Sequence, residues 1–435
     1  MESKRIALWG LVVAIVLVVA YIFAGGLYIE QQMIPVSTTA QVEILDGDYT
    51  LSEPIRLTWS EGGTAYGFPD AYEDKTCFGY YDGDDDYVGY RYYDENVTYL
   101  LDRQITTVGA ELGWGLFTVY EDYIAYMEYD WSATPELYSY LYDIDSDDYI
   151  LVNYSNPTDD VFFEEPNVAV HGDRYIFIEY AHWDTYPYCN VTIYNITDGT
   201  YWHLAQYDVL ADDDVPFGVR IDEDIAMWLV WDDSASEVLF CYYDFDTDTL
   251  VEYVDHTDSN MEVYWYGDCS GDYISLTYLN DSTWNNTIQL YDVTTGEFAN
   301  VYEHSNYAVG DWISGEFLTY TDTEFSFGNI SLHHVPSGEN WTVDGNTSLE
   351  YDCYYSKLHM ADDGNGYIVY NRDGSLDVWL VYLNSTLEQE VIPQQFETQN
   401  VYNLYNLYLS IILSLFAGCL VIYDDSQNNW LRRYV

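Results

Sequence analysis

The sequence predicts an all-β fold and, within that class, a single β-propeller. Runs of roughly 4–8 residues rich in Tyr, Val, Ile and Trp follow one another from residue 41 onward. No amphipathic helical pattern of useful length appears after residue 30. A unit of constant layout recurs about every 50 residues, which is the spacing of four-stranded propeller blades.

The clearest repeat units begin at Glu121, Gly172, Asp222, Gly271, Ser314 and Gly364, with 43 to 51 residues between successive starts. Each unit opens on a small or acidic turn and continues through an apolar strand, a polar hairpin and a second strand. A tight turn such as DVTTGE or NITDGT then leads to a third strand. Glycine in this turn supplies a positive φ. A fourth strand is expected before each unit, as in NVAVH before Gly172.

Two further units decide the blade count. One is expected from Asp86, and another from LYLSIILSLFAGCLVIY (407–423), in which FAGCLVIYDD aligns with SGEFLTYTD. We therefore favour eight blades, with seven as the alternative. An N-terminal segment, QVEIL (41–45) or PIRLTW (54–59), would supply the closing strand and remove both exposed edges. The other interpretation of 407–423 is a second membrane segment.

One hairpin carries a resemblance to known proteins. LYDVTTGEF (290–298) and its relatives resemble the hairpins of quinoprotein-like, TolB-like and YVTN-type propellers. The resemblance covers most of residues 40–435 and implies binding at the two faces of a propeller, without implying a chemistry. The scarcity of lysine resembles that of halophilic or acid-adapted archaeal surface proteins.

The charge balance restricts the partners. With 75 acidic and 12 basic residues, the chain has a formal net charge of −63. Such a body repels phosphate backbones, so we expect no nucleic-acid partner. The 18% aromatic content argues against disorder.

An apolar segment lies near the start of the sequence. Residues 6–29 contain no charge, and 24 helical residues would span roughly 36 Å. Lys4 and Arg5 precede the segment, which favours a cytoplasmic N-terminus. We therefore expect a stub (1–5), a single-pass anchor (6–29), a linker (30–40) and an extracellular propeller (41–435) in the cell membrane. A cleaved signal peptide is the alternative, although its apolar region is usually shorter.

An extracellular body agrees with the number of glycosylation sequons. These occur at Asn96, Asn153, Asn190, Asn195, Asn280, Asn285, Asn329, Asn340, Asn346 and Asn384. Each match is weak alone, but together they predict that some are glycosylated.

Alternating carboxylates are the candidate metal ligands. They are Asp143, Asp145 and Asp147 in LYDIDSDD, and Asp244, Asp246 and Asp248 in YYDFDTDT. Oxygen ligands at this spacing can bind Ca²⁺, but no glycine follows at the sixth position as an EF-type loop requires. Alignment with the other units instead favours ordinary turns. No cofactor other than Ca²⁺ is indicated.

The cysteines and histidines give two further expectations. Cys77 and Cys419 lie in the proposed first and last blades, so a disulfide between them would lock the ring. The histidines match no zinc motif. Propeller geometry could bring some of them to the central channel; the scattered ones are His171, His182, His203, His256, His304 and His359.

The sequence favours a non-enzymatic function. The leading hypothesis is a membrane-anchored surface propeller that binds a surface protein or a glycan, or serves as a scaffold or envelope component. The alternatives are a glycan-active or quinoprotein-like enzyme, whose carboxylates would meet at the channel mouth, and a TolB-like envelope assembly factor.

Overall fold

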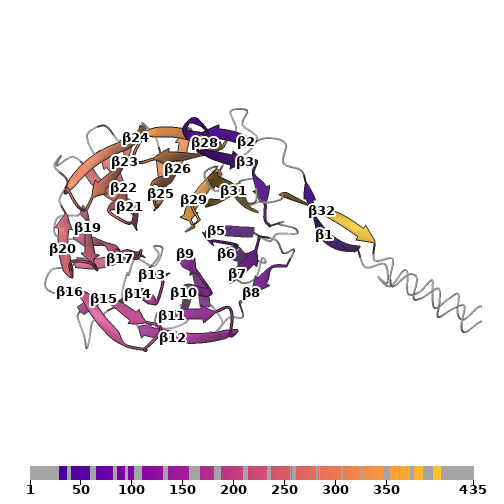
Figure 1. The fold of residues 1–435 in the computed structure, drawn as a ribbon. Coiled ribbons are helices and arrows are strands. Elements are labelled where there is room, and N and C mark those ends of the chain that lie inside the picture. Colours follow the sequence, from indigo (N-terminus) through magenta and orange to yellow (C-terminus); the bar gives the residue numbers. More distant parts are fainter. Residues whose placement is uncertain are drawn as a thin grey trace, which may run out of the picture. The chain divides into compact units, whose positions relative to one another are not determined.

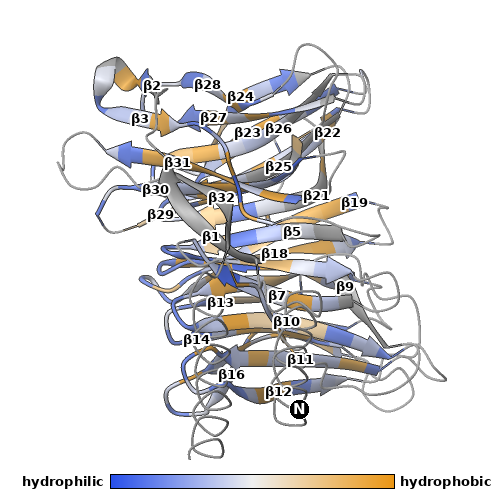
Figure 2. Ribbon diagram, turned by 90° about the vertical axis from the view of Figure 1, so that its right-hand side faces the viewer, coloured by the Kyte–Doolittle hydropathy of each residue, from blue (hydrophilic) through white to orange (hydrophobic). Residues whose placement is uncertain are grey.

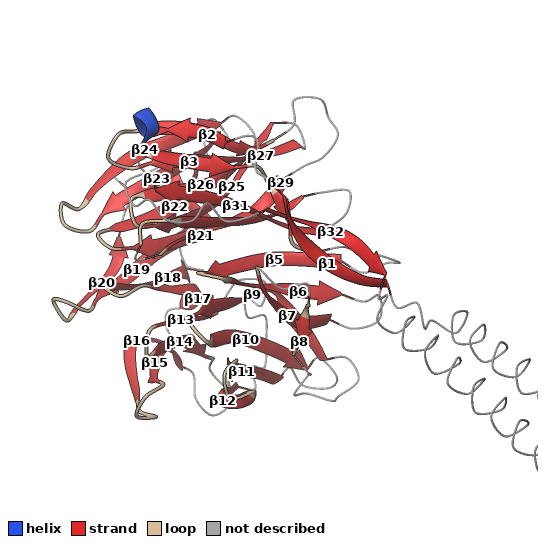
Figure 3. Ribbon diagram, turned by 45° about the vertical axis from the view of Figure 1, so that its right-hand side comes forward, coloured by secondary structure: helices blue, strands red, loops and turns tan. Residues whose placement is uncertain are grey.

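The computed structural model describes most of residues 29–402. The described residues are 29–36, 41–58, 65–81, 86–93, 97–101, 110–130, 136–155, 167–180, 188–208, 214–232, 237–254, 256, 261–280, 283, 285–304, 307–324, 327–345, 353–361, 363–372, 377–385 and 395–402. They form two units, a propeller and a two-stranded ribbon, and we describe each by itself. Apart from the short 3₁₀ helix η2 (Leu45–Gly47), the regular elements described are strands (Figure 3).

The propeller has seven blades, which follow one another in chain order around a ring (Figure 1). Each blade is an antiparallel sheet whose first strand is innermost. The innermost strands are β5 (Ala65–Tyr72), β9 (Ala110–Tyr120), β13 (Val168–His171), β17 (Asp214–Ile221), β21 (Met261–Ser270), β25 (Tyr307–Ser314) and β29 (Cys353–Met360). The second strands are β6 (Lys75–Tyr81), β10 (Tyr123–Asp130), β14 (Arg174–Glu179), β18 (Ile225–Asp232), β22 (Tyr273–Asn280), β26 (Phe317–Glu324) and β30 (Gly366–Arg372).

The outer half of each blade follows the same order. The third strands are β7 (Asp86–Tyr92), β11 (Glu136–Asp143), β15 (Tyr188–Asn195), β19 (Glu237–Asp244), β23 (Asn285–Asp292), β27 (Phe327–His334) and β31 (Asp377–Ser385). The fourth strands of the first six blades are β8 (Tyr99–Leu100), β12 (Asp148–Ser155), β16 (Tyr201–Asp208), β20 (Thr249–Val254), β24 (Glu297–His304) and β28 (Glu339–Asp344).

The seventh blade is completed from the start of the propeller. Strand β31 pairs with β3 (Tyr49–Ser52), which pairs in turn with β2 (Gln41–Ile44), and the short β4 (Ile55–Arg56) also pairs with β31. The expected closure by an N-terminal segment is therefore confirmed, although it completes the seventh blade and the main closing strand, β3, lies between the two expected segments 41–45 and 54–59. The expected eight blades are wrong, because β3 fills the outer position of the seventh blade. The interpretation of 407–423 as an eighth blade fails with that count, and this run lies outside the described residues.

The register of the repeat also differs at one blade. Asp86 begins β7, the third strand of the first blade, and the turn equivalent to the other unit starts lies at Glu73. The expected fourth strand before each unit is confirmed as the innermost strand, for example at β13 before Gly172.

Buried hydrophobic residues of neighbouring blades form shared clusters. Hydrophobic stretches are visible along β19 and β31 (Figure 2). Strand β18 is buried along six consecutive positions because both of its faces are covered by other blades. Its Trp228 is fully buried, and its indole N–H donates a 2.7 Å hydrogen bond to the hydroxyl of Tyr207 in the preceding blade. The polar atom of this large side chain is thereby satisfied within the core.

Polar contacts hold the closing segment. The fully buried carboxylate of Asp377 on β31 contacts the guanidinium of Arg56 and accepts a 3.3 Å hydrogen bond from the Thr58 hydroxyl. The Thr58 hydroxyl also accepts the N–H of Val378 at 2.9 Å. Ser52 accepts the N–H of Tyr382 at 2.9 Å in the same way. These bonds satisfy β31 groups next to a short closing strand.

The ribbon consists of β1 (Ile29–Val36) and β32 (Gln395–Tyr402), which are antiparallel. Its register pairs Ile29 with Tyr402 and Val36 with Gln395. In the part of the chain that the structure describes, no helix has the length and apolarity required to cross a membrane. The predicted anchor at 6–29 lies outside the described residues except for Ile29, so it stays a prediction.

Candidate functional site in the central channel

The innermost strands enclose a cavity of about 490 Å³ where they end and turn into the second strands. Alternate residues of a strand face the same side, so each innermost strand contributes two side chains to this cavity. The side chains at or next to the end of each innermost strand form a mouth layer: Tyr72, Tyr120, His171, Asp222, Ser270, Ser314 and His359. The residue two positions earlier forms an inner layer: Asp70, Thr118, Ala169, Arg220, Asp268, Trp312 and Lys357. At about 3.3 Å per residue, the layers lie roughly 6–7 Å apart along the strands.

Tight turns hold the mouth layer in place. In the third, fifth and sixth blades the residue after the mouth position is a glycine with φ near 55°, as at Gly271. In the first two blades Glu73 and Glu121 take the same left-handed conformation, at φ 46° and 49°. This conformation is unfavourable for a residue with a Cβ, so the paired strands must impose it. Glu73 lines the cavity, whereas Glu121 is not among the lining residues.

The mouth layer contains a continuous arc of rings. The ring centroids of His359 and Tyr72 are 4.3 Å apart, and those of Tyr72 and Tyr120 are 4.4 Å apart. Tyr120 is followed by His171 at 4.1 Å, and His171 Nδ1 lies 3.5 Å from a carboxylate oxygen of Asp222. Four aromatic rings from the seventh, first, second and third blades thus lead to a carboxylate on the fourth.

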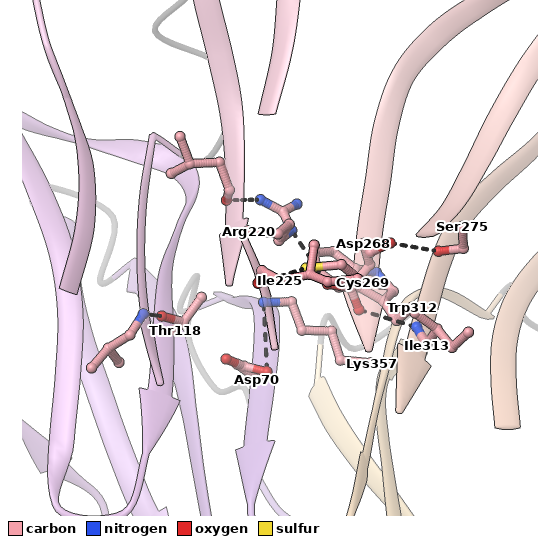
Figure 4. A network of polar contacts seen from close by, with 12 residues as sticks. Asp70, Thr118, Arg220, Ile225, Asp268, Cys269, Ser275, Trp312, Ile313 and Lys357 are labelled. Atoms are coloured by element: carbon pink, nitrogen blue, oxygen red, sulfur yellow. Dashed lines mark hydrogen bonds and ion pairs between the residues drawn. The ribbon is translucent and has the colours of Figure 1, made fainter. Parts of the chain in front are cut away.

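The inner layer gathers two of the twelve basic residues of the chain (Figure 4). The guanidinium carbon of Arg220 and the ammonium of Lys357 lie 4.4 Å and 4.3 Å from the ring centroid of Trp312. These distances permit cation–π attraction. Each cation also has a carboxylate neighbour.

Those carboxylate neighbours are Asp268 and Asp70. Arg220 Nε is 4.0 Å from Asp268 Oδ1, and Lys357 Nζ is 3.6 Å from Asp70 Oδ1 (Figure 4). Both separations exceed the usual length of a charge-assisted hydrogen bond, so the pairs are loose. Two basic side chains and two carboxyl groups therefore share the largely buried inner layer with Trp312.

The same carboxylates join neighbouring blades. Asp70 Oδ2 accepts the N–H of Val119 at 2.9 Å, and Asp268 Oδ2 accepts the N–H of Ile313 at 3.0 Å. In the mouth layer, Asp222 accepts the N–H of Gly271 at 2.8 Å. Ser270 and Ser314 accept the N–H groups of Gly315 and Met360, at 3.0 and 2.9 Å. A belt of bonds from side chain to backbone therefore keeps the channel wall in shape.

Burial dominates the electrostatics of the channel. Removal from water raises the pKa of Asp268 to about 7, an effect that Arg220 and the nearby backbone N–H groups reduce but do not cancel. Burial followed by the neighbouring Asp246, Asp222 and Glu223 carboxylates raises the pKa of Asp224. Burial also lowers the pKa of His171, despite the adjacent Asp222. The mouth is therefore crowded with negative charge that lacks full solvation.

The predicted metal ligands lie elsewhere, in the turns between the third and fourth strands. Asp143 Oδ1 accepts the N–H groups of Asp145 and Ser146 at 3.0 and 3.1 Å. Asp147 and Asp248 have φ values of 52° and 53°, at the position where other blades have glycine. Among the described residues, no three His, Cys, Asp or Glu side chains come together as a metal site. The turn interpretation of these residues therefore accounts for their hydrogen bonds.

The other turn shows the same arrangement. Asp244 Oδ1 accepts the N–H of Thr247 at 3.0 Å, and Asp248 contacts the hydroxyl of Tyr243. Asp246 is a turn residue next to the Asp224 carboxylate, whose pKa it helps to raise. Calcium binding by either turn stays a prediction.

The predicted disulfide and sequons are only partly described. Cys77 is fully buried with a free thiol, while Cys419 lies outside the described residues. Asn190 and Asn384 are 1% and 8% exposed, so the folded chain shields them. Asn340 is exposed. Asn153, Asn195, Asn280, Asn285 and Asn329 are partly exposed, and Asn96 and Asn346 lie outside the described residues. Both modifications stay predictions.

Sequence reasoning found part of the channel. His171 and His359 do reach it, whereas the described His203, His256 and His304 are not among its lining residues. It missed Arg220, Lys357 and the rings of Tyr72 and Tyr120. One signal was present: basic residues are rare, and these two lie in the runs 215–220 and 354–360, where innermost strands are expected.

Known proteins resemble this chain in structure and not in sequence. No family model matches the chain, and no curated protein matches it. The β-propeller domain of the Trilobed protease from Pyrococcus furiosus is 9% identical with a TM-score of 0.50, covering 80% of this chain and 98% of that one. An oligogalacturonate lyase from Vibrio parahaemolyticus is 9% identical with a TM-score of 0.47, covering 82% and 98%. TolB from Acinetobacter baumannii is 12% identical with a TM-score of 0.38, covering 75% and 81%. At 9% identity, the likeness to the Trilobed protease domain shows the fold alone, a β-propeller.

Proposed function

We propose that this protein is a membrane-anchored binding propeller that takes a basic side chain of a partner protein into the mouth of its channel. The arc of four rings ending at Asp222 is the observation that carries the proposal. Aromatic faces and carboxylates around one cavity attract a cation more strongly than either group alone. The pocket is also large enough for one long side chain.

The crowding of carboxylates supports a cationic ligand. Glu73, Asp222, Glu223 and Asp224 all border the mouth. A bound ammonium or guanidinium would reduce the repulsion that helps to raise the pKa of Asp224. The overall charge of −63 would also speed the encounter with a basic partner.

The anchor supports a location at a cell surface. Residues 6–29 have the length and composition of a membrane span, and Lys4 and Arg5 precede them. A tether of this kind would hold the propeller near membrane-bound partners outside the cell. Extraction of native membranes with alkaline carbonate tests this part separately, since an anchored protein stays in the pellet.

Calorimetric titration of the detergent-solubilised full chain tests the ligand class. The probes are the blocked peptide Gly-Gly-Lys-Gly-Gly and the same peptide with glutamate in place of lysine. We expect the lysine peptide alone to bind. Its affinity should fall about tenfold in the Glu223→Gln/Asp224→Asn variant, because two partly screened attractions are lost.

A matched control removes two charges far from the mouth. Asp145→Asn/Asp148→Asn makes the same change in net charge within an exposed turn. It should leave the affinity for the lysine peptide unchanged. Equal losses in both variants would reduce the effect to overall charge and overturn the proposed site.

A glycan-active enzyme is the second candidate function, and one observation favours it. Asp268 lies in the same cavity as Trp312, and burial raises the pKa of this carboxyl to about 7. A carboxyl that is half protonated near neutral pH is suited to general acid catalysis. Turnover of any substrate in a glycan panel, lost in Asp268→Asn, would support this candidate over binding alone.

A further inference from the structure

The ribbon brings two distant parts of the sequence to one place. Strands β1 and β32 are antiparallel over eight residue pairs, from Ile29–Tyr402 to Val36–Gln395 (Figure 3). The first residue of β1, Ile29, and the last residue of β32, Tyr402, therefore lie at the same end of the ribbon. The opposite end, at Val36 and Gln395, leads towards the residues of the propeller sequence.

An apolar run of sequence adjoins that shared end on each side. Residues 6–28 contain no charged residue and run directly into β1. Residues 404–423, LYNLYLSIILSLFAGCLVIY, contain none either and begin one residue after β32 is left. The two strand ends that are paired, Ile29 and Tyr402, are thus each followed or preceded in the sequence by an uncharged run of about 20 residues.

The propeller has no place for the second run. Its seventh blade is completed by β3, which pairs with β31, so no blade lacks a strand that 407–423 would supply. The expectation of a single-pass protein depended on placing this run in an eighth blade. A run with this many Leu, Ile, Val and Phe residues is costly to leave in water, because its apolar surface stays exposed.

We infer that residues 404–423 cross the membrane beside the anchor. The protein then has two membrane spans, and the pairing of β1 with β32 keeps their outer ends together. Twenty residues at about 1.5 Å each span roughly 30 Å, the thickness of the hydrocarbon core. The inference rests on the proposed anchor at 6–29 and adds a second crossing to it.

The flanking charges agree with this topology. Lys4 and Arg5 lie beyond the outer end of the first run, and Arg432 and Arg433 lie beyond the second. Because the two runs leave the ribbon together, both basic pairs would reach the same side of the membrane. Basic residues at both ends on the cytoplasmic side satisfy the positive-inside rule.

Tag accessibility in intact and permeabilised cells tests the topology of the full chain. One epitope follows Val435, one precedes Met1, and a control epitope is inserted between Asp232 and Glu237 in the propeller. We expect the two terminal tags to be detected only after permeabilisation, and the propeller tag in intact cells. Detection of the tag after Val435 in intact cells would overturn the second crossing.

Arginine substitutions test each of the two spans by itself. Ile15→Arg/Val19→Arg disrupts the first run, and Ile412→Arg/Leu415→Arg disrupts the second. We expect each double variant to stay in the carbonate-washed membrane pellet, and the quadruple variant to lose at least nine-tenths of its membrane fraction. If Ile15→Arg/Val19→Arg alone releases the protein from the membrane, residues 6–29 are the anchor and the second span is wrong. If the unmodified chain is found in the soluble fraction, the proposed anchor is wrong.

Discussion

The ammonium of Lys357 lies 3.6 Å from a carboxylate oxygen of Asp70, and this pair joins the last blade of the propeller to the first. Asp70 also accepts the N–H of Val119 in the second blade. Asp70 therefore links its own blade, the first, to both neighbouring blades at the channel. The ring is closed at its centre by this pair and at its rim by β3 on β31.

Removal of the cation should destabilise the ring. Lys357→Met leaves the Asp70 carboxylate largely buried without its partner, so the free energy of unfolding should fall by about 2–3 kcal/mol. Urea unfolding followed by tryptophan fluorescence measures the change. The double variant Lys357→Met/Asp70→Asn removes both charges and should recover at least half of the loss. If the double variant is as unstable as the sum of the single variants, the pair is not the cause.

Stability should depend on pH through Asp268. Its folded pKa of about 7 lies above the ordinary value of 3.8, so the folded state holds the proton more tightly than the unfolded state. The contribution of this group is fully present below about pH 4 and is lost as the pH rises to 7, at a total cost of roughly 4 kcal/mol. The other acidic residues also make the free energy of unfolding depend on pH. The protein is therefore compared with the Asp268→Asn variant at each pH. The difference in unfolding free energy between the two proteins should change between pH 4 and 7 and stay level above 7.

The rim closure should depend on Asp377. Asp377→Ala removes the acceptor of Arg56 and Thr58 in a fully buried position, and should cost about 3 kcal/mol of stability. Limited proteolysis should then cut first within residues 41–58, since the closing segment has lost its attachment to β31. The exposed Asp148→Ala serves as the control and should change neither stability nor cleavage. An unchanged cleavage pattern in Asp377→Ala would show that backbone pairing alone holds the segment.

The buried thiols should be unreactive in the folded protein. Burial raises the pKa of the Cys77, Cys269 and Cys353 thiols, so little thiolate forms and reagents have no access. Iodoacetamide should modify these residues only after unfolding in urea. The same peptide map tests the predicted bond to Cys419: a Cys77 that is alkylated in urea without reductant is not part of a disulfide.

How much of this protein could be predicted from its sequence depends on the range of the interactions involved. Alternation of apolar residues and tight turns such as DVTTGE are local, and they suffice to predict strands, blades and the innermost strand before each unit. The closure by an N-terminal strand followed from the cost of an exposed edge. The number of blades did not follow, because β3 pairs with β31 more than 300 residues away. A run such as FAGCLVIYDD can match a strand pattern even though β3 already completes the seventh blade.

The channel, too, was only partly predictable from the sequence. The sequence by itself determined that each innermost strand would present alternate side chains to the centre of a propeller. Only the tertiary structure decided that Arg220, Trp312 and Lys357 meet there, while the alternating aspartates at Asp143 and Asp244 remain in outer turns. The physical reason is that a blade's register along its own strands is set locally. The neighbours of a side chain across the channel are set by packing seven blades into a closed ring.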